Sequence, residues 1–172
     1  SFSGDYISEF LEDNDYHYIY TENFPSSLIG YDAVFLSFGF HTDGTSGAPC
    51  QDWMADQIIE YLKSGGKMHF EAGDILGFTQ AENEKLLSIL GLDSTAEVPE
   101  EQRIDTLAGN ENSIMTGMLF DSYRYSKVYS VDFLEANESA INTFESPDGV
   151  SYGVQFENKE TNSTSVVSTI PL

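Results

Sequence analysis

The sequence predicts an α/β protein: a three-layer sandwich with a mainly parallel sheet, followed by a C-terminal half rich in β-strands. Three observations lead to this fold class. Residues 32–39 form a nearly continuous apolar run of strand length, which is typical of a strand covered on both faces. An amphipathic helix pattern and a second strand pattern follow it at the spacing of a βαβ unit. Beyond Asp93 this rhythm gives way to short strand patterns separated by turn residues.

The first half of the chain alternates helix and strand patterns. Apolar periodicity indicates the helices, while aromatic and β-branched runs favour the strands. Glycines after the later helices indicate where those helices end. The expected elements are a helix over 4–13 with Ser3 as its N-cap, a strand over 16–20, the strand over 32–39, a helix over 51–62 ended by Gly65 and Gly66, a strand over 67–71, and a helix over 82–90 ended by Gly91.

Residues 94–172 are expected to be the β-rich part of the same domain. Residues 94–112 are polar and show no clear period. Ser146-Pro147-Asp148-Gly149 has the turn chemistry of a β-hairpin. The expected strands of this half are 113–120, 127–133, 140–144, 150–156 and 165–170.

Length and charge restrict the classes of function. The 172 residues suit a single domain, 1–172, and they carry 29 Asp and Glu against 7 Lys and Arg, a net charge of −22. Residues 1–62 contain neither Lys nor Arg. Nucleic acid and anionic membrane surfaces require a basic patch and are therefore excluded as partners. A run of about 18 apolar residues is also lacking, so the sequence predicts no membrane insertion.

The two ends of the sequence indicate a domain excised from a longer chain. The sequence begins at Ser1 without Met, and it ends on the apolar residues 169–172. Other domains of a parent protein are therefore expected partners.

Two segments resemble class I glutamine-amidotransferase-like domains. Leu28–Phe40, with its Tyr-Asp-Ala-Val step, is similar to one of their strands, and Ile59–Asp74 is similar to their segment of helix, Gly-Gly, strand and Gly-Asp. Residues 119–123 and 130–132 resemble a variant found in large secreted bacterial proteins, often of the Bacteroidetes. The resemblance implies a flavodoxin-like fold and an extracellular or cell-surface location. That fold has a central strand before the first helix. Here either the strand lies outside the sequence, or another segment or chain supplies it.

The resemblance also predicts the loss of amidotransferase activity. In those enzymes the nucleophilic Cys lies on the turn after the strand that corresponds to 67–71, whereas here Gly73 and Asp74 occupy the turn. A non-catalytic module that acts in scaffolding or ligand binding is therefore the first hypothesis, with a protein or a glycan as its ligand.

The alternative is a hydrolase with its site at the carboxyl edge of the parallel strands, where open α/β folds bind ligands. His41, Glu71 and Asp74 are the candidate catalytic residues. Asp43, Glu71 and Asp74 could bind a divalent cation, which would assist the reaction. No other cofactor is expected. The Ser- and Thr-rich loop 42–47 does not favour flavin, because it follows the wrong strand and carries an Asp.

Two further features are open to a functional interpretation. Cys50 could be a thiolate stabilised at a helix N-terminus, as in a peptidase that also uses His41, although a free, half-buried thiol is the simpler interpretation. A glycan- or protein-binding surface would show as an exposed aromatic patch formed by Tyr123, Tyr125, Tyr129 and Tyr152. His17 and His69 are expected within strands, as packing or solvated residues.

Overall fold

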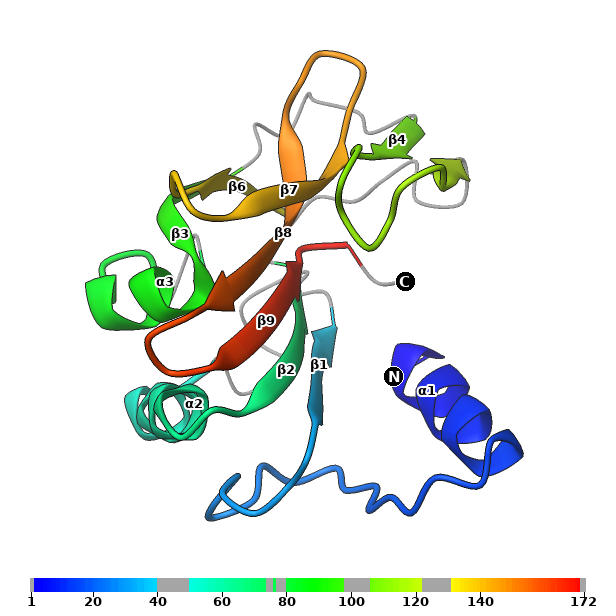
Figure 1. The fold of residues 1–172 in the computed structure, drawn as a ribbon, viewed down its shortest axis with the longest axis vertical. Coiled ribbons are helices and arrows are strands. Elements are labelled where there is room, and N and C mark those ends of the chain that lie inside the picture. The colour runs from blue at the N-terminus through cyan, green and yellow to red at the C-terminus, as the bar shows by residue number, and fades with distance from the viewer. Residues whose placement is uncertain are drawn as a thin grey trace.

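The computed structural model describes residues 2–39, 50–73, 76, 80–97, 106–121 and 131–170 (Figure 1). Three helices lie within these ranges: α1 (Phe2–Asp13), α2 (Asp52–Lys63) and α3 (Glu84–Leu90). The strands are β1 (Val34–Gly39), β2 (Lys67–Ala72), β3 (Leu92–Glu97), β4 (Thr106–Gly109), β5 (Leu119–Asp121), β6 (Asp132–Ala136), β7 (Ile141–Glu145), β8 (Ser151–Asn158) and β9 (Ser163–Ser168).

The main sheet has seven strands in the order β1-β2-β9-β8-β7-β4-β5, and β3 and β6 form a separate antiparallel pair. Only the β1–β2 and β2–β9 pairs are parallel, whereas the other four neighbouring pairs are antiparallel. The prediction of a mainly parallel, three-layer flavodoxin-like sandwich is therefore wrong. The reason is the short connections β7–β8 and β8–β9, because strands joined by a tight turn can pair only antiparallel.

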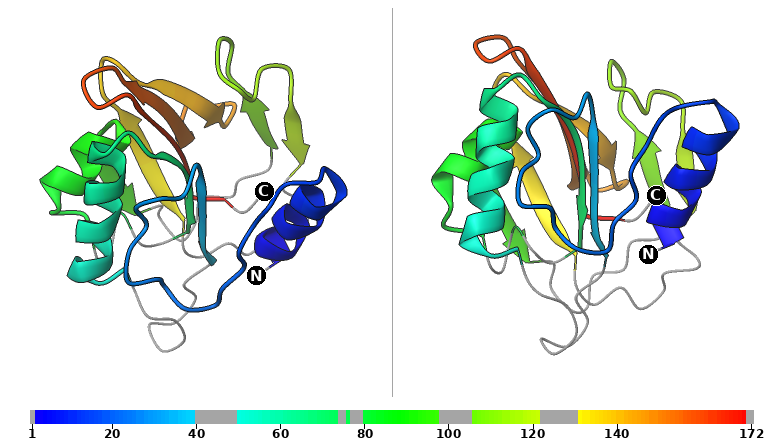
Figure 2. Two further views of the ribbon diagram at one scale, coloured as in Figure 1. Left: turned by 60° about the horizontal axis from the view of Figure 1, so that its bottom comes forward. Right: turned by 90° about the horizontal axis from the view of Figure 1, so that it is seen from below.

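α2 and α3 cover one face of the parallel strands (Figure 2). The main core lies between these two helices and the strands. Ile58 and Leu62 of α2 pack there with Phe70 of β2 and Val167 of β9, all of them buried. α1 lies on the other side of the sheet, where it contacts β1. A second, smaller core is formed by residues in and next to the antiparallel strands: Leu107, Val131, Phe144, Tyr152 and Ile170. No helix among the described residues is long and apolar enough to span a membrane.

The connection from α2 to β2 follows from local chemistry. Gly65 adopts φ +90°, a conformation that ends the helix at little cost only for glycine. The Tyr61 hydroxyl lies 3.1 Å from the backbone oxygens of Tyr31 and Lys67, which share its single proton, and it accepts from the Lys67 N–H at 3.2 Å. A Cβ on Gly66 would lie 2.4 Å from the Tyr61 ring. The Gly-Gly step therefore both ends α2 and admits the ring that fixes the start of β2.

Several predicted elements are confirmed. β1, α2, β2, α3 and β9 lie within about three residues of their predicted bounds. Asn83 caps α3 by accepting from the Leu86 N–H at 3.1 Å, and Gly91 ends it at φ +84°. The hairpin of β7 and β8 forms as predicted, with Gly149 in the turn at φ +81°.

Six local predictions are wrong. Residues 16–20 form no strand, because no described strand pairs with them. Ser3 lies inside α1 and not at its N-cap, since the helix begins at Phe2. The run 32–39 is not covered on both faces, because Phe35 is 48 % exposed. The polar stretch 94–112, for which no element was expected, contains most of β3 and all of β4, and the strands expected over 113–120 and 127–133 begin later, at Leu119 and Asp132.

Candidate functional site

A row of buried and partly buried polar side chains crosses the parallel strands near their carboxyl ends. Glu71 of β2 is 1 % exposed, and its register partners are Ser37 of β1 and Ser168 of β9. Since register partners on neighbouring strands point to the same face of the sheet, the three side chains lie side by side. This face is opposite the one that carries the core residues Phe70 and Val167.

Glu71 is held by its neighbour on β1. The Ser37 hydroxyl donates to Glu71 Oε1 at 2.6 Å. Ser168 turns to its own strand end, where its hydroxyl donates to the Ile170 oxygen and accepts from the Ile170 N–H. Glu71 is thus a buried, hydrogen-bonded carboxyl group. This arrangement links β1 to β2 and leaves little access for a substrate.

The backbone after Glu71 is tied to two other segments. The Gly73 N–H donates to the Gly39 oxygen at 3.1 Å, and the Gly73 oxygen accepts from the Asp132 N–H at 2.9 Å. Asp132, at the start of β6, is fully buried. A second acidic residue is therefore fixed beside the turn after β2. Asp132 was not among the candidate residues, because it was expected inside a strand over 127–133 and not at the start of one.

His69 lies on the same face as Glu71, two residues earlier on β2. Its ring is 6.2 Å from that of Phe35. Burial lowers the pKa of His69, while the nearby Glu71 carboxylate acts in the opposite direction. The lowered pKa favours a neutral imidazole near pH 7, which agrees with packing, one of the two roles expected for this residue.

Of the candidate catalytic and metal-binding residues, only Glu71 is within the part of the chain that the structure describes. His41, Asp43 and Asp74 lie outside it, so their convergence on Glu71 stays a prediction. Among the described residues, no three His, Cys, Asp or Glu side chains are grouped so that they could hold a metal ion.

Cys50 does not have the environment of a nucleophile. It is 1 % exposed, and burial together with the Asp52 charge raises the pKa of its thiol to about 12. Gln80 Nε2 donates to the Cys50 oxygen at 2.7 Å and fixes the backbone there. Thiol nucleophiles react as thiolates. The helix N-terminus that follows at Asp52 does not offset the burial, so the structure gives Cys50 a neutral thiol.

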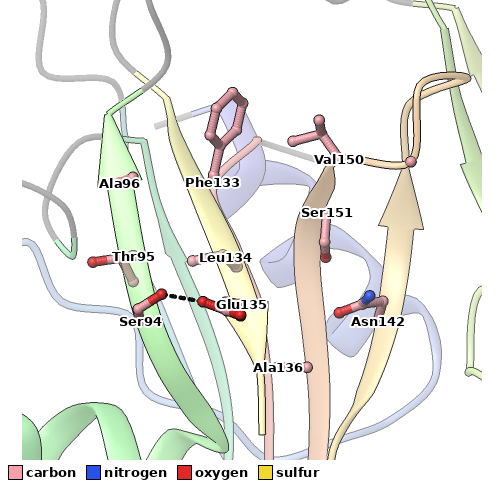
Figure 3. A pocket seen from close by; sticks show the side chains of 11 residues that line it. Ser94, Thr95, Ala96, Phe133, Leu134, Glu135, Ala136, Asn142, Val150 and Ser151 are labelled. Carbon is pink, nitrogen blue, oxygen red and sulfur yellow. Dashed lines mark hydrogen bonds between the residues drawn. The ribbon is translucent and has the colours of Figure 1, made fainter.

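A groove that the sequence did not indicate lies between the β3–β6 pair and the β7–β8 hairpin (Figure 3). Its volume is about 400 Å³, and Phe133 and Val150 form its apolar part. Ser94 Oγ donates to Glu135 Oε2 at 2.5 Å within it, and Asn142 Nδ2 donates to Glu145 Oε1 at 2.9 Å. Sequence reasoning missed the groove because it depends on β3, whose residues are polar.

Exposed apolar side chains are concentrated in the first third of the chain. Of the fourteen large hydrophobic residues that are exposed in the described ranges, ten lie between residues 6 and 53. They come from α1, the segment that follows it, β1 and the start of α2: Tyr6, Phe10, Tyr16, Tyr18, Ile19, Tyr20, Ile29, Tyr31, Phe35 and Trp53. We call these ten residues the N-terminal apolar surface; they share a stretch of sequence, whereas α1, with Tyr6 and Phe10, and α2, with Trp53, lie on opposite sides of the sheet.

The aromatic patch expected from the C-terminal tyrosines is not supported at Tyr152. This residue is 1 % exposed, and its ring packs at 5.7 Å from that of Phe133. Burial, with a smaller contribution from Asp148, raises the pKa of the Tyr152 phenol to about 12. Tyr123, Tyr125 and Tyr129 lie outside the described residues.

Comparison with known proteins identifies the fold. No protein-family model matches the chain, and no curated protein is significantly similar to it in sequence. The N-terminal domain of mmIFT52 matches 96 % of this chain and 77 % of its own, with a TM-score of 0.58 and 14 % identity. A glutamine amidotransferase from Thermotoga maritima matches 95 % of this chain and 67 % of its own, with a TM-score of 0.54 and 13 % identity. At such identities the likeness concerns the fold alone, and the fold is glutamine amidotransferase-like.

Proposed function

We propose that this chain is a non-catalytic, glutamine amidotransferase-like module that binds another protein or another domain of its parent protein. The N-terminal apolar surface is the observation that carries the proposal. Adjoining exposed apolar side chains are typical of interaction sites, and Tyr6 and Phe10 of α1, with exposed fractions of 68 % and 62 %, lie one helical turn apart. Ten such side chains within residues 6–53 greatly exceed the four found in the rest of the described chain.

The buried thiol of Cys50 supports the proposal that the module is not catalytic. Cys50 is the only cysteine of the sequence, and its thiol is buried with a raised pKa. Gly73 and Asp74 occupy the turn that carries the nucleophile in amidotransferases. Glutamine hydrolysis by a cysteine nucleophile would need a thiolate next to an activating base. This chain offers no other sulfhydryl group for that step.

The proposed location of the module rests on the sequence resemblance. Residues 119–123 and 130–132 are similar to segments of large secreted bacterial proteins. We place the module on that basis outside the cell or at its surface, as part of a larger protein. The charge of −22 supports this setting only indirectly, because it favours solubility for a domain with exposed aromatic residues.

The first experiment tests catalysis. The purified chain is incubated with glutamine, ammonia is measured, and the Cys50→Ala variant serves as the matched control. We expect the same ammonia release from both proteins, equal to the uncatalysed background. Release by the wild type that the Cys50→Ala variant abolishes would overturn the non-catalytic part of the proposal.

The second experiment tests the interaction surface. A neutral apolar dye such as Nile red should fluoresce when it binds the wild type, and the Tyr6→Ser/Phe10→Ser variant should lower this signal. Met118 and Leu119 are also exposed but lie elsewhere in the chain, so a Met118→Ser/Leu119→Ser variant is the matched control. Equal dye binding by all three proteins would show that the N-terminal apolar surface is not accessible.

A further inference from the structure

The groove between the β3–β6 pair and the β7–β8 hairpin combines an apolar wall with an exposed carboxylate (Figure 3). In the register of the pair, Glu135 lies opposite Ser94, and Phe133 lies opposite Ala96. Residues two apart on a strand point to the same face, so Phe133 and Glu135 share a wall, about 7 Å apart along β6. The groove volume of about 400 Å³ is that of a small-ligand site.

The side chains of the groove that can donate hydrogen bonds already do so within the protein. The acceptors are the Glu135 carboxylate, a second carboxylate on β7 and two backbone oxygens. Four residues with side-chain O–H or N–H groups line the groove, and each makes one such bond: Ser94, Thr95, Asn142 and Ser151. A ligand in the groove therefore meets few donors that are still available.

The acceptors of the groove, in contrast, have unused capacity. Glu135 is exposed, and Ser94 is its one hydrogen-bond partner in the described part of the chain, so Glu135 Oε1 can accept from a ligand. Asn142 Oδ1 is buried and accepts no hydrogen bond from any described residue. Figure 3 shows the Asn142 side chain turned towards β8, across the groove from β6. A buried acceptor without a donor costs free energy, which a donor from a ligand would recover.

The charge of the groove favours a cation. None of its lining residues, all of which are described, is Lys, Arg or His, whereas Glu135 carries a carboxylate. The chain as a whole has a charge of −22, which attracts cations and repels anions. An ammonium group has three donors and no acceptor, which is the complement of this groove. The ring of Phe133 adds a face over which a cation is attracted.

We propose that the groove binds an organic cation, an ammonium group on a short apolar stem. The ammonium group pairs with Glu135 Oε1, and the stem lies along Phe133 and Val150. A Lys side chain of another protein and a free alkylamine both present this chemistry. The site uses no residue of the N-terminal apolar surface, so it goes beyond the proposed function and stands or falls separately from it.

The test titrates the chain with n-butylammonium and follows its backbone amide signals by NMR. The ionic strength is kept near about 0.01 M, where charges are weakly screened. Three probes serve as controls: n-butanol has the stem without the charge, ammonium chloride has the charge without the stem, and butyrate has the opposite charge. We expect saturable shifts at Ser94 and Glu135 with n-butylammonium, and binding of each control that is weaker by about tenfold or more.

Variants locate the cation. Glu135→Gln keeps an acceptor for Ser94 and removes the charge, so it should weaken the binding of n-butylammonium by about tenfold. Glu160→Gln, at an exposed position between β8 and β9, changes the net charge equally and is the matched control. This variant should bind as the wild type does. Circular dichroism of both variants establishes that they are folded.

A blocked lysine, N-acetyl-lysine N-methylamide, distinguishes the two sources of the cation. Binding as tight as that of n-butylammonium supports a Lys side chain of a partner protein, and binding weaker by about tenfold or more supports a free amine.

Three results would overturn the proposal. The first is the absence of saturable shifts in β3 and β6 with n-butylammonium, and the second is equally tight binding of n-butanol. The third is an equal loss of binding in Glu135→Gln and Glu160→Gln, which would mean a general attraction to an acidic surface. None of these results changes the dye binding expected at the N-terminal apolar surface, so the proposed function is tested independently.

Discussion

Glu71 illustrates why a residue type in a suggestive position does not by itself make a site. Its place near the carboxyl end of a parallel strand predicted an accessible acidic group. The structure instead buries it to 1 % exposure and pairs it with Ser37 at 2.6 Å. Sequence can locate the strand end, because the apolar pattern of β2 is clear. It cannot show whether the face is open, since that depends on segments distant in the chain.

The Ser37–Glu71 hydrogen bond should contribute measurably to stability. Ser37→Ala removes the donor and leaves a buried carboxyl oxygen with one partner fewer. We expect the free energy of unfolding to fall by about 1–3 kcal/mol in urea denaturation. Ser37→Thr, which keeps the hydroxyl, should recover most of the loss, and Ser88→Ala at an exposed position of α3 should change stability by less than about 0.5 kcal/mol. Equal effects of Ser37→Ala and Ser88→Ala would show that the bond contributes nothing.

Cys50 should make the protein less stable at alkaline pH. Its folded-state pKa of about 12 is raised from 9.0. Above pH 9 the unfolded chain therefore loses the thiol proton while the folded chain keeps it, so the free energy of unfolding falls as pH rises from about 9 towards 12, by up to about 1.4 kcal/mol per pH unit. Tyr61 and Tyr152, whose pKa values are also raised, act in the same direction.

The Cys50→Ala variant isolates this contribution. Loss of the buried sulfur lowers its stability by an amount that does not depend on pH. The difference between wild type and variant should therefore shrink from pH 9 upwards in urea denaturation. A constant difference over this range would mean that the thiol ionises equally in both states.

At the scale of elements, the sequence predicted those helices and hairpins whose capping or turn residues lie within the segment itself. α3 has Asn83 at its start and Gly91 at its end, and the β7–β8 hairpin has its turn chemistry in four consecutive residues. Residues 16–20 have strand-forming side chains but no described strand beside them, and they form none. β3 is the reverse case, since its polar residues pair with β6 although they show no strand pattern. A strand requires a neighbour, and a local pattern does not identify one.

Two glycines with similar backbone angles separate the cost of a left-handed backbone from the cost of a steric clash with an added Cβ. Gly91 and Gly149 have φ values of +84° and +81°. A Cβ on Gly149 would meet nothing within 4 Å, whereas one on Gly91 would lie 2.4 Å from Phe156 Cβ. We expect Gly149→Ala to cost about 1–2 kcal/mol from the backbone alone. Gly91→Ala should cost about 1–3 kcal/mol more, because α3 or β8 must also move. Equal losses in urea denaturation would mean that the α3–β3 turn adapts to the added methyl group.

At the scale of the whole molecule, the sequence predicted a glutamine amidotransferase-like fold but the wrong sheet. The βαβ unit from β1 to β2 is confirmed. The sheet becomes mixed because β9 returns beside β2, in parallel, as the last strand of an antiparallel run. Its residues, Ser163–Ser168, carry no sign of which strands they join. Topology of this kind depends on which edges remain free after the hairpins form.

The net charge of −22 gives the last prediction. Folding brings these carboxylates closer together, so their repulsion opposes the compact state more than the unfolded one. Raising NaCl from about 0.01 M to about 1 M shortens the screening length from about 30 Å to about 3 Å. We expect the Tm to rise by about 2–4 °C or more, which corresponds to about 1 kcal/mol in a protein of this size. In calorimetry, the Glu9→Gln/Glu12→Gln/Asp13→Asn variant should show a smaller rise, since fewer exposed carboxylates remain to be screened. A Tm that falls with salt would instead mean that attractive ion pairs outweigh the repulsion, and the excess of acidic residues would then not be a burden on the fold.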